Sequence, residues 1–241
     1  MKYLMYCIFS SIGPAQMDCK PEGVGGGQVQ VIENNGLAAA VSAVSEVDIS
    51  KDPLTVIAYH KIIETFHGQT CVIPLRFGTI VNHESEVQHL LQEHADRYKS
   101  LLSQLDGRVE MSVRVILADN SPALEASHEP VLADSSSSES GAAYLARRKA
   151  HHEAQELACA RNKEVVERYC SLFKGLFVNS KFEISKLAVH TNVVLSLHFL
   201  VPRHSIESFR KAYGHLKSRE SAKIMLSGPW PPYNFVLPED Y

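Results

Sequence analysis

The chain has 241 residues and a mass of 26.8 kDa, with 45% hydrophobic and 21% charged residues. This composition is typical of a globular protein and argues against the disordered, collagen-like and coiled-coil classes. The formal net charge of −3 gives no electrostatic attraction to nucleic acid or to an anionic membrane. No apolar run reaches the roughly 18 residues that a membrane-spanning helix needs. We therefore expect neither nucleic acid nor a membrane among the partners of this chain.

The chain contains five cysteines, an odd number without any C-x-x-C pair. This usage fits reduced thiols and predicts a cytoplasmic protein. Residues 2–9 could open a signal peptide, but their aromatic and β-branched content favours a first strand instead. No small-residue cleavage site follows them.

Three strands are predicted before the first helix. Residues 2–9 read as a buried strand, and residues 28–32 alternate between polar and apolar side chains. The turn at 34–36, Asn-Asn-Gly, predicts a hairpin whose second strand covers residues 37–44. The glycine-rich residues 23–27 lack the spacing of a phosphate-binding loop and precede a strand instead of a helix, so we expect a plain flexible loop.

Asp52 followed by Pro53 predicts a helix start, since a capping side chain precedes proline at the first helical position. Gly68 is expected to end this helix. Its predicted apolar side contains Val56, Ile57, His60, Ile63, and Phe66 or His67. Residues 70–77 then form a short strand that Pro74 confines to a sheet edge or a bulge.

A second helix is predicted between Asn82, as its cap, and Gly107, where it ends. Glu84 and Glu86 suit the positive end of its dipole. One apolar stripe identifies it, made by Val87, Leu90, Leu91, His94, Tyr98, Leu101, Leu102 and Leu105.

In the second half, alternation over 109–115 predicts a strand with Glu110, Ser112 and Arg114 on a solvated face. Residues 118–140 are too polar to offset the entropy of ordering, so we interpret them as a mobile insertion. The remaining predicted elements are a helix from Gly141 to about Val178, strands at 182–190 and 192–200, a helix at 204–217 and a strand at 222–227.

These elements predict an α+β protein with two domains. Residues 1–107 form an N-terminal α+β domain, and residues 108–228 read β-α-β-β-α-β. This order is the ferredoxin-like pattern, an antiparallel sheet with helices on one face, here with a long first helix and the variable insertion at 118–140. Residues 229–241 form a C-terminal tail rich in proline and aromatic residues.

The sequence contains no recognisable active site. His152 and Glu156 share a helix face and could bind a metal only with a third ligand from elsewhere, so a solvated charged face is the simpler interpretation. The RNA-binding signature of ferredoxin-like modules is missing. We expect no catalytic residue, no cofactor and no resident metal. A nucleic-acid or small-metabolite binding module and a metal-dependent enzyme using His152 and Glu156 remain as alternatives.

Two stretches combine residues in a way that packing alone does not explain. In the first, Arg76 stands between apolar residues beside Pro74 and Gly78, where it could cap carbonyls, pair with a carboxylate or contact a partner. The second carries the only tryptophan of the chain among three prolines. Such a segment is stiff and extended, so its aromatic rings can dock on the protein itself or on a partner at little entropic cost.

With these stretches, the chain resembles the gas vesicle protein GvpF/GvpL family. The matching landmarks run through nearly the whole chain in the order of the family. They are Tyr3-Leu4-Met5-Tyr6, the segment 36–42 (GLAAAVS), His60, the segment 72–79 (VIPLRFGT), Ala143-Tyr144-Leu145 and the segment 228–236 (GPWPPYNFV). Residues 118–140 depart from the pattern, and the small net charge argues against a halophilic source.

The resemblance implies a protein without enzymatic activity that is a minor structural component or assembly factor of gas vesicles in the cytoplasm. Its expected partners are the apolar major wall protein and other gas vesicle proteins. A wall subunit aggregates unless its apolar surface is covered, so we hypothesise that this chain binds it during shell nucleation. The candidate contact or structural signature positions are Arg76, Phe77, Gly78, Gly228, Pro229, Trp230, Pro231, Pro232 and Tyr233.

Overall fold

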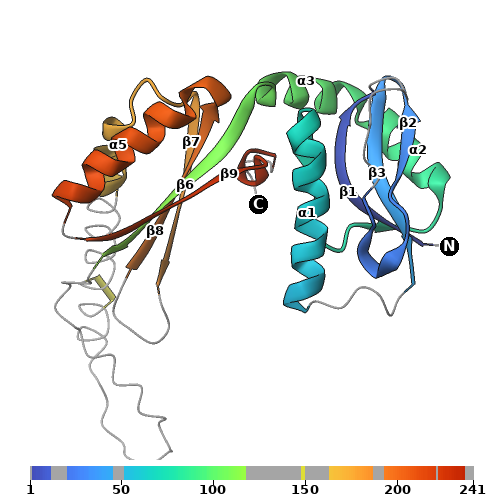
Figure 1. The fold of residues 1–241 in the computed structure, drawn as a ribbon, viewed down its shortest axis with the longest axis horizontal. Helices are drawn as coiled ribbons and strands as arrows, with labels where there is room; N and C mark the ends of the chain where they lie inside the picture. Colours follow the sequence, from blue (N-terminus) through green and yellow to red (C-terminus); the bar gives the residue numbers. More distant parts are fainter. Residues whose placement is uncertain are drawn as a thin grey trace, which may run out of the picture.

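The computed structural model describes residues 2–11, 21–45, 52–117, 148–149, 163–186, 193–220 and 222–236. It contains two antiparallel sheets, each accompanied by helices, and the helix α3 (Ala95–Leu105) connects them (Figure 1). The predicted α+β class is confirmed. None of the helices in the described part of the chain combines the length and apolar character needed to span a bilayer.

The N-terminal sheet has five strands in the order β2-β3-β1-β4, with β5 paired to β1 beside β4. Their bounds are β1 Lys2–Ser10, β2 Gln30–Asn34, β3 Leu37–Val44, β4 Val72–Pro74 and β5 Ile80–Val81. Both faces of this sheet are covered. The helix α1 (Pro53–Gln69) contacts β1 and β4 on one face, while α2 (Glu84–Glu93) and α3 pack on the other.

The hairpin predicted at 34–36 is confirmed, with φ of 53° at Asn35 and 76° at Gly36. The glycine-rich residues 23–27 differ from the expected flexible loop. They contain a 3-10 turn, η1 (Val24–Gly26), in which the N–H of Val24 donates to the Tyr6 hydroxyl at 2.9 Å. A Cβ on Gly23 would lie 2.7 Å from Ser42, so close packing explains the glycine there.

Helix α1 begins as predicted, because the carboxylate of Asp52 accepts from the N–H groups of Leu54 and Thr55. Its predicted apolar side is wrong at two positions. Val56 and Ile57 are 40% and 51% exposed. The buried positions are Tyr59, Ile62, Ile63, Phe66 and His67. The pattern of apolar residues was ambiguous because apolar side chains stand on both sides of this helix.

The single helix predicted between residues 82 and 107 is two helices, α2 and α3, which meet at His94. The change of direction lets α2 pack on β2 and β3 while α3 packs on β4 and β1. The predicted cap is also wrong, since Asn82 lies outside the helix and its N–H donates to Glu86 at 2.9 Å. The strand predicted at 70–77 is shorter, and Pro74 lies in the edge strand β4 as expected.

The C-terminal sheet has four strands in the order β7-β8-β6-β9. Its elements are β6 Arg108–Leu117, β7 Asn179–Lys186, β8 Val193–Pro202, η3 Arg203–Ser205, α5 Ile206–Arg219 and β9 Lys223–Trp230. One face packs against α5 and a helix over residues 163–172. Phe173, Phe199 and Phe209 form the centre of that core, where the rings of Phe173 and Phe209 stack at 4.3 Å.

Several predicted boundaries in this half change. The helix expected to reach Val178 ends at residue 172, and β9 continues past residue 227 to Trp230. The insertion at 118–140, most of the first half of the predicted helix, and His152 and Glu156 lie outside the described residues.

The solvated face predicted for β6 is wrong at two of its three positions. Arg114 is exposed, but Glu110 and Ser112 are only 3% and 6% exposed. Both point away from the helix-covered core, so another part of the chain must cover them. This cover is the C-terminal segment.

Candidate functional site

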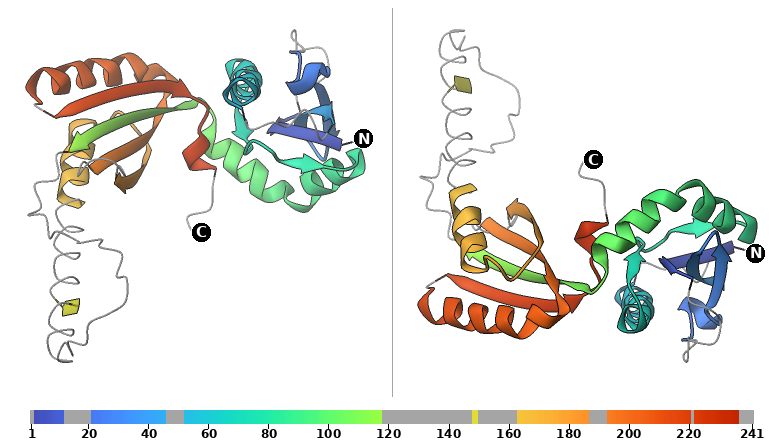
Figure 2. Two further views of the ribbon diagram at one scale, coloured as in Figure 1. Left: turned by 90° about the horizontal axis from the view of Figure 1, so that it is seen from below. Right: turned by 90° about the horizontal axis from the view of Figure 1, so that it is seen from above.

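The C-terminal segment, residues 228–236, lies between the two sheets. It leaves the C-terminal sheet at the end of β9 and continues into the 3-10 turn η4 (Tyr233–Phe235). Figure 2 shows η4 close to α3 and to the beginning of β6, where the two halves of the molecule meet. The segment therefore docks on the protein itself, one of the two possibilities that its sequence left open.

Gly228 lets β9 pass close to β6. The pairing shifts register here, from Ser112 opposite Ser227 to Glu110 opposite Trp230. Gly228 has φ of +108°, and a Cβ added to it would lie 2.6 Å from the backbone oxygen of Glu110. Only glycine fits both the backbone conformation and this close approach.

The aromatic residues of the segment contact α1. The centroid of the His60 ring lies 5.4 Å from the centroid of the Trp230 ring and 5.6 Å from the centroid of the Tyr233 ring. The Tyr233 hydroxyl is 2.6 Å from His60 Nδ1, and His60 Nε2 is 3.2 Å from the carboxylate of Glu64. Burial raises the pKa of Tyr233. The protonated hydroxyl can thus donate to Nδ1 while Nε2–H donates to Glu64.

Asn234 closes a polar cluster on the face of β6 that was expected to be solvated. Its backbone N–H and side-chain amide both donate to the carboxylate of Glu110, at 2.9 and 2.6 Å. His198 Nδ1 lies 3.2 Å from the same carboxylate and 2.9 Å from the Ser112 hydroxyl. Because every member has partners, the cluster can be buried at little cost.

Apolar contacts complete the docking of the segment. Pro231 and Pro232 are buried. Phe235 is 8% exposed and joins the core on the α2 and α3 side of the N-terminal sheet, together with Leu200 of β8. Tyr233 packs against the core on the α1 side. The C-terminal segment thus packs into the cores on both faces of the N-terminal sheet. Because the segment continues from β9, it ties these cores to the C-terminal sheet.

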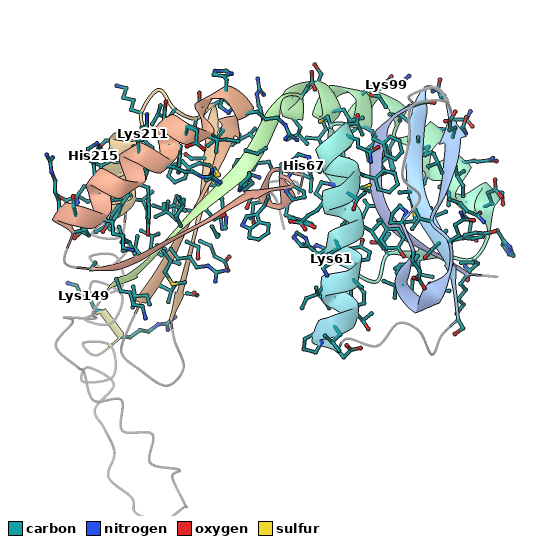
Figure 3. The ribbon with its side chains drawn as sticks, in the orientation of Figure 1. Lys61, His67, Lys99, Lys149, Lys211 and His215 are labelled. Carbon is teal, nitrogen blue, oxygen red and sulfur yellow. The ribbon has the colours of Figure 1, made fainter. Side chains whose placement is uncertain are left out.

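His67 and Arg203 make a second contact between the two halves. The Arg203 guanidinium donates to the backbone oxygen of His67 at 2.8 Å and lies 3.3 Å from its Nε2. Figure 3 shows His67 on the side of α1 that faces the C-terminal half. Burial, together with the Arg203 charge, lowers the pKa of His67 to about 4. The ring is therefore neutral near pH 7, with Nε2 as the acceptor.

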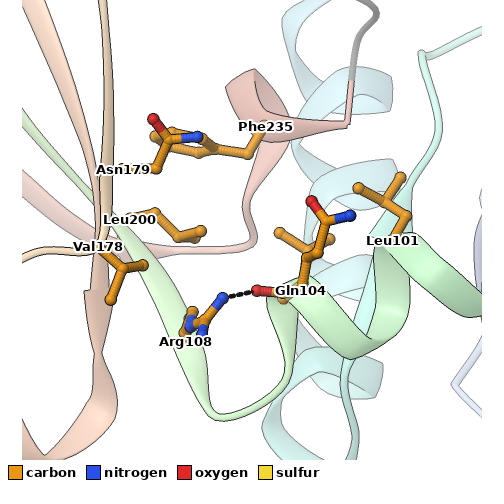
Figure 4. Close-up of a pocket in the computed structure, with 8 residues that line it drawn as sticks. Leu101, Gln104, Arg108, Val178, Asn179, Leu200 and Phe235 are labelled. Atoms are coloured by element: carbon orange, nitrogen blue, oxygen red, sulfur yellow. Dashed lines mark hydrogen bonds between the residues drawn. The ribbon is translucent and has the colours of Figure 1, made fainter.

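A pocket of about 310 Å³ opens beside this junction (Figure 4). Leu101 and Gln104 of α3, Arg108 of β6 and Phe235 of η4 contribute to its wall. The Arg108 guanidinium donates to the backbone oxygen of Gln104. The guanidinium, which is the charged group among the lining residues, therefore already has a partner within the chain. We interpret the pocket as a gap between packed elements.

The stretch with Arg76 and Phe77 lies between β4 and β5. The Phe77 ring packs edge-on against Tyr59 at 5.2 Å. The Tyr59 hydroxyl donates to the backbone oxygen of Met5 at 2.8 Å and also lies 3.1 and 3.2 Å from the backbone oxygens of Leu75 and Arg76. The Arg76 side chain is exposed and forms no hydrogen bond or ion pair with any described residue. Of the roles that remained open for Arg76, capping of carbonyls and pairing with a carboxylate are therefore not found within the described part of the chain.

Within the described ranges, no three histidine, cysteine, aspartate or glutamate side chains are grouped to hold a metal ion. The residues that hold the C-terminal segment on the C-terminal sheet were mostly missed from the sequence. Glu110, His198 and Asn234 come from separate elements, and only Asn234 belongs to a stretch singled out by its composition. No local signal links these positions.

The sequence and the fold can be compared with known proteins. A model of the family described as gas vesicle synthesis protein GvpL/GvpF matches residues 2–237. The chain belongs to this family. The GvpL/GvpF resemblance drawn from the landmark stretches is thus confirmed.

Gas vesicle protein L of Streptomyces sp. (strain CB03234) is 28% identical over 233 residues, which cover 89% of this chain and 85% of that protein. Gas vesicle protein F2 of Halobacterium salinarum (strain ATCC 700922 / JCM 11081 / NRC-1) is 20% identical over 220 residues, covering 89% and 83%. This GvpL/GvpF chain is accordingly a gas vesicle protein, similar over most of its length to both L-type and F-type relatives.

Two crystal structures share the fold of this GvpL/GvpF chain. GvpF from Anabaena sp. PCC7120 has a TM-score of 0.71 at 19% identity, with 100% of this chain and 98% of that chain covered. GvpF from Microcystis aeruginosa has a TM-score of 0.72 at 18% identity, with 98% and 99% covered. Both agree with an α+β architecture built on two antiparallel sheets.

Proposed function

We propose that this chain is a non-enzymatic minor structural component or assembly factor of gas vesicles. It binds the apolar major wall protein and prevents its aggregation while the shell nucleates. Membership of the GvpL/GvpF family supports the gas vesicle role. The observation that carries the binding role is a group of exposed aliphatic side chains on the first two turns of α1.

This group, the α1 apolar patch, consists of Leu54 and Ile57, which stand three residues apart on one face of the helix and are 77% and 51% exposed. The opposite side of the same helix is buried against the N-terminal sheet. Single exposed aliphatic residues are common on protein surfaces, whereas contiguous exposed apolar side chains are the kind of surface on which partners dock. The patch thus offers an apolar surface to a partner.

An apolar wall subunit needs such a surface before it enters the shell. Its exposed apolar area would otherwise associate with other copies, because removing apolar area from water is favourable by about 25 cal/mol per Å². A soluble partner that covers part of that area competes with aggregation. In this role the C-terminal segment, with Trp230 and Tyr233 against His60, holds α1 in place beside the C-terminal half.

The other expectations follow the same proposal. The chain acts in the cytoplasm in association with gas vesicles, its partners are the major wall protein and other gas vesicle proteins, and it performs no catalysis. We also propose the division into residues 1–107, 108–228 and 229–241. The strand order β7-β8-β6-β9, with helices on one face, supports a ferredoxin-like arrangement for the middle unit.

The test is co-expression of the major wall protein with this chain, followed by measurement of wall protein in the soluble fraction. The double variant Leu54→Ser, Ile57→Ser removes both side chains of the α1 apolar patch without touching a buried position. We expect wall protein that is soluble with the wild type to move to the insoluble fraction with this variant.

Leu172→Ser is the matched control. Leu172 is 48% exposed and lies at the end of the helix over residues 163–172, in the other half of the molecule. It should leave wall protein soluble, and circular dichroism should show that all variants fold. Wall protein that stays as soluble with the double variant as with the wild type, or that is never soluble with the wild type, would refute the binding role.

A further inference from the structure

Helix α5 forms an outer layer of the C-terminal half (Figures 1 and 2). Its inner side belongs to the core of that half, where Phe209 and Leu216 are buried and the Tyr213 hydroxyl donates to the backbone oxygen of Ile224 at 3.1 Å. The opposite side, the α5 outer face, is exposed along the whole helix. It consists of Glu207, Ser208, Arg210, Lys211, Gly214, His215, Lys217, Ser218 and Arg219.

The α5 outer face carries an excess of positive charge. The helix contains four lysines and arginines and a single acidic residue, Glu207, although the formal net charge of the whole chain is −3. Glu207 is paired with Arg210 at 2.8 Å. Lys211, Lys217 and Arg219 form no ion pair or hydrogen bond with any described residue. These three cations can therefore pair with carboxylates of another molecule.

Lys211 is the cation that the stability of the helix explains least. Lys217 and Arg219 lie in the last turn, where the helix dipole stabilises positive side chains. Lys211 lies in the middle of the helix, where this gain is absent. Figure 3 shows it on α5 together with His215, which follows one turn later. Residues four positions apart share a helix face, so Lys211 and His215 present neighbouring hydrogen-bond donors.

Gly214 lies beside this pair, at an exposed position in the interior of α5. Glycine is a poorer helix former than alanine. A Cβ added to Gly214 would meet nothing within 4 Å, so no contact with the described residues requires a glycine here. The glycine does provide a notch in the surface of the helix, where the backbone of a partner can approach more closely than a side chain would allow.

An acidic helix fits both the charge and the notch. Packed helices lie about 8–10 Å apart, and the separation depends on the size of the side chains at the crossing point. Lys211 and Lys217 lie three residues before and three residues after Gly214, where acidic side chains of a crossing helix can reach them. Nucleic acid and an anionic bilayer present phosphates over a wide surface that needs no notch, and the net charge of the chain gives no attraction to either.

We propose that the α5 outer face binds an acidic helix of a partner protein, which crosses α5 at Gly214 and pairs its carboxylates with Lys211 and Lys217. Salt screens exposed charges, so this binding weakens as the ionic strength rises. The α1 apolar patch belongs to the other half of the molecule, so the inference does not rest on the proposed function.

A model helix tests the proposal on the full chain. The probe is a fluorescent, alanine-based helical peptide of about 20 residues with glutamates along one face, and its counterpart carries glutamine at the same positions. Fluorescence anisotropy at low ionic strength should show binding of the glutamate peptide. Binding of the glutamine peptide should be weaker by about tenfold, because it lacks the charges that pair with the lysines.

Charge reversal tests the named cation. Lys211→Glu should weaken binding of the glutamate peptide by about tenfold, because it replaces an attraction with a repulsion. Lys99→Glu is the matched control, since it makes the same charge change at an exposed position on α3 and should leave binding unchanged. Lys211→Glu should also keep the wall protein as soluble as the wild type does, so the two proposals can fail separately.

Gly214→Ala tests the crossing point. Alanine favours the helix, so the variant should unfold at the same temperature as the wild type or at a higher one. It should nevertheless bind the glutamate peptide about fivefold more weakly, because the added methyl group prevents the close approach. Gly68→Ala is the matched control, since Gly68 is an exposed glycine of α1 at which a Cβ would also meet nothing within 4 Å.

The proposal is overturned if the glutamate peptide does not bind, or if the glutamine peptide binds as tightly. It is equally overturned if Lys211→Glu or Gly214→Ala binds the glutamate peptide like the wild type. A DNA duplex of about 20 base pairs, or vesicles containing phosphatidylserine, that bind more tightly than the peptide at the same salt concentration would also overturn it.

Discussion

Asn234 donates twice to one buried carboxylate, from its backbone N–H to Glu110 Oε2 at 2.9 Å and from its side-chain amide to Oε1 at 2.6 Å. The two residues are 124 positions apart. Glu110 lies on β6, at the start of the C-terminal sheet, and Asn234 lies on η4, which packs on the N-terminal half. This bidentate contact therefore fixes η4, whose residues Tyr233 and Phe235 pack on the N-terminal half, to the C-terminal sheet.

Asn234→Ala should lower the free energy of unfolding by about 2 kcal/mol, since it removes the side-chain donor from a buried carboxylate. Urea denaturation followed by circular dichroism measures the change. The control Asn179→Ala affects an exposed amide and should cost much less. Equal unfolding midpoints for Asn234→Ala and wild type would show that the contact does not stabilise the fold.

Gly228→Ala should destabilise the protein by roughly 3 kcal/mol, because it combines an unfavourable positive φ with a clash against the Glu110 backbone. Gly78→Ala separates the two effects. Gly78 has φ of +89°, but a Cβ there would meet nothing within 4 Å, so only the backbone cost of about 1–2 kcal/mol applies. If thermal unfolding shows the same loss of stability for the two variants, the close approach of β9 to β6 adds no cost to an alanine at position 228.

Tyr233→Phe should lower the free energy of unfolding by about 1 kcal/mol, because it removes the hydroxyl that bonds to His60 Nδ1 at 2.6 Å and keeps the ring. Tyr3→Phe is the control, since the Tyr3 hydroxyl has no hydrogen-bond partner among the described residues. Chemical denaturation measures the free energy of unfolding of both variants. The prediction fails if Tyr3→Phe lowers it as much as or more than Tyr233→Phe.

His67 should make stability depend on pH. Its pKa is lowered from 6.5 to about 4 in the folded protein, so the unfolded chain binds a proton first as the pH falls. Above pH 6.5 the ring is neutral in both the folded and the unfolded chain, so it does not lower the free energy of unfolding. Between pH 6.5 and about 4 the unfolded chain is protonated first, and the free energy of unfolding falls progressively. The loss at pH 4 amounts to at most about 3 kcal/mol.

His67→Gln removes the titrating group and keeps an acceptor for Arg203. Between pH 7 and pH 4, we expect the free energy of unfolding to fall less in this variant than in the wild type, measured by denaturation at each pH. Parallel pH profiles for the two proteins would contradict the prediction.

Arg76→Ala should change the free energy of unfolding by less than about 0.5 kcal/mol, because the side chain is exposed and contacts no described polar group. Phe77→Ala should cost about 2 kcal/mol, because it removes a partly buried ring from Tyr59. Thermal unfolding compares the two. A large loss in Arg76→Ala would reveal a structural role for that side chain.

Local rules predicted the elements whose cause lies within a few residues. Asp52 caps α1, Asn35 and Gly36 form the hairpin turn, and Pro74 lies on an edge strand, as their residue types indicated. The break of the long helix at His94 was missed, because no glycine or proline marks it and the packing of α2 and α3 on different strands determines it.

The sequence by itself determined the α+β class, most strands and helices, and the family, because periodicity, caps, turns and landmark stretches are written in neighbouring residues. Only the tertiary structure decided that Glu110 and Ser112 are buried. Alternation along β6 shows that its two faces differ in polarity, and it carries no information about a distant segment that covers the polar face. The burial of that face arises because Gly228 turns the chain close to β6 and brings Asn234 onto it, a contact between residues far apart in the chain.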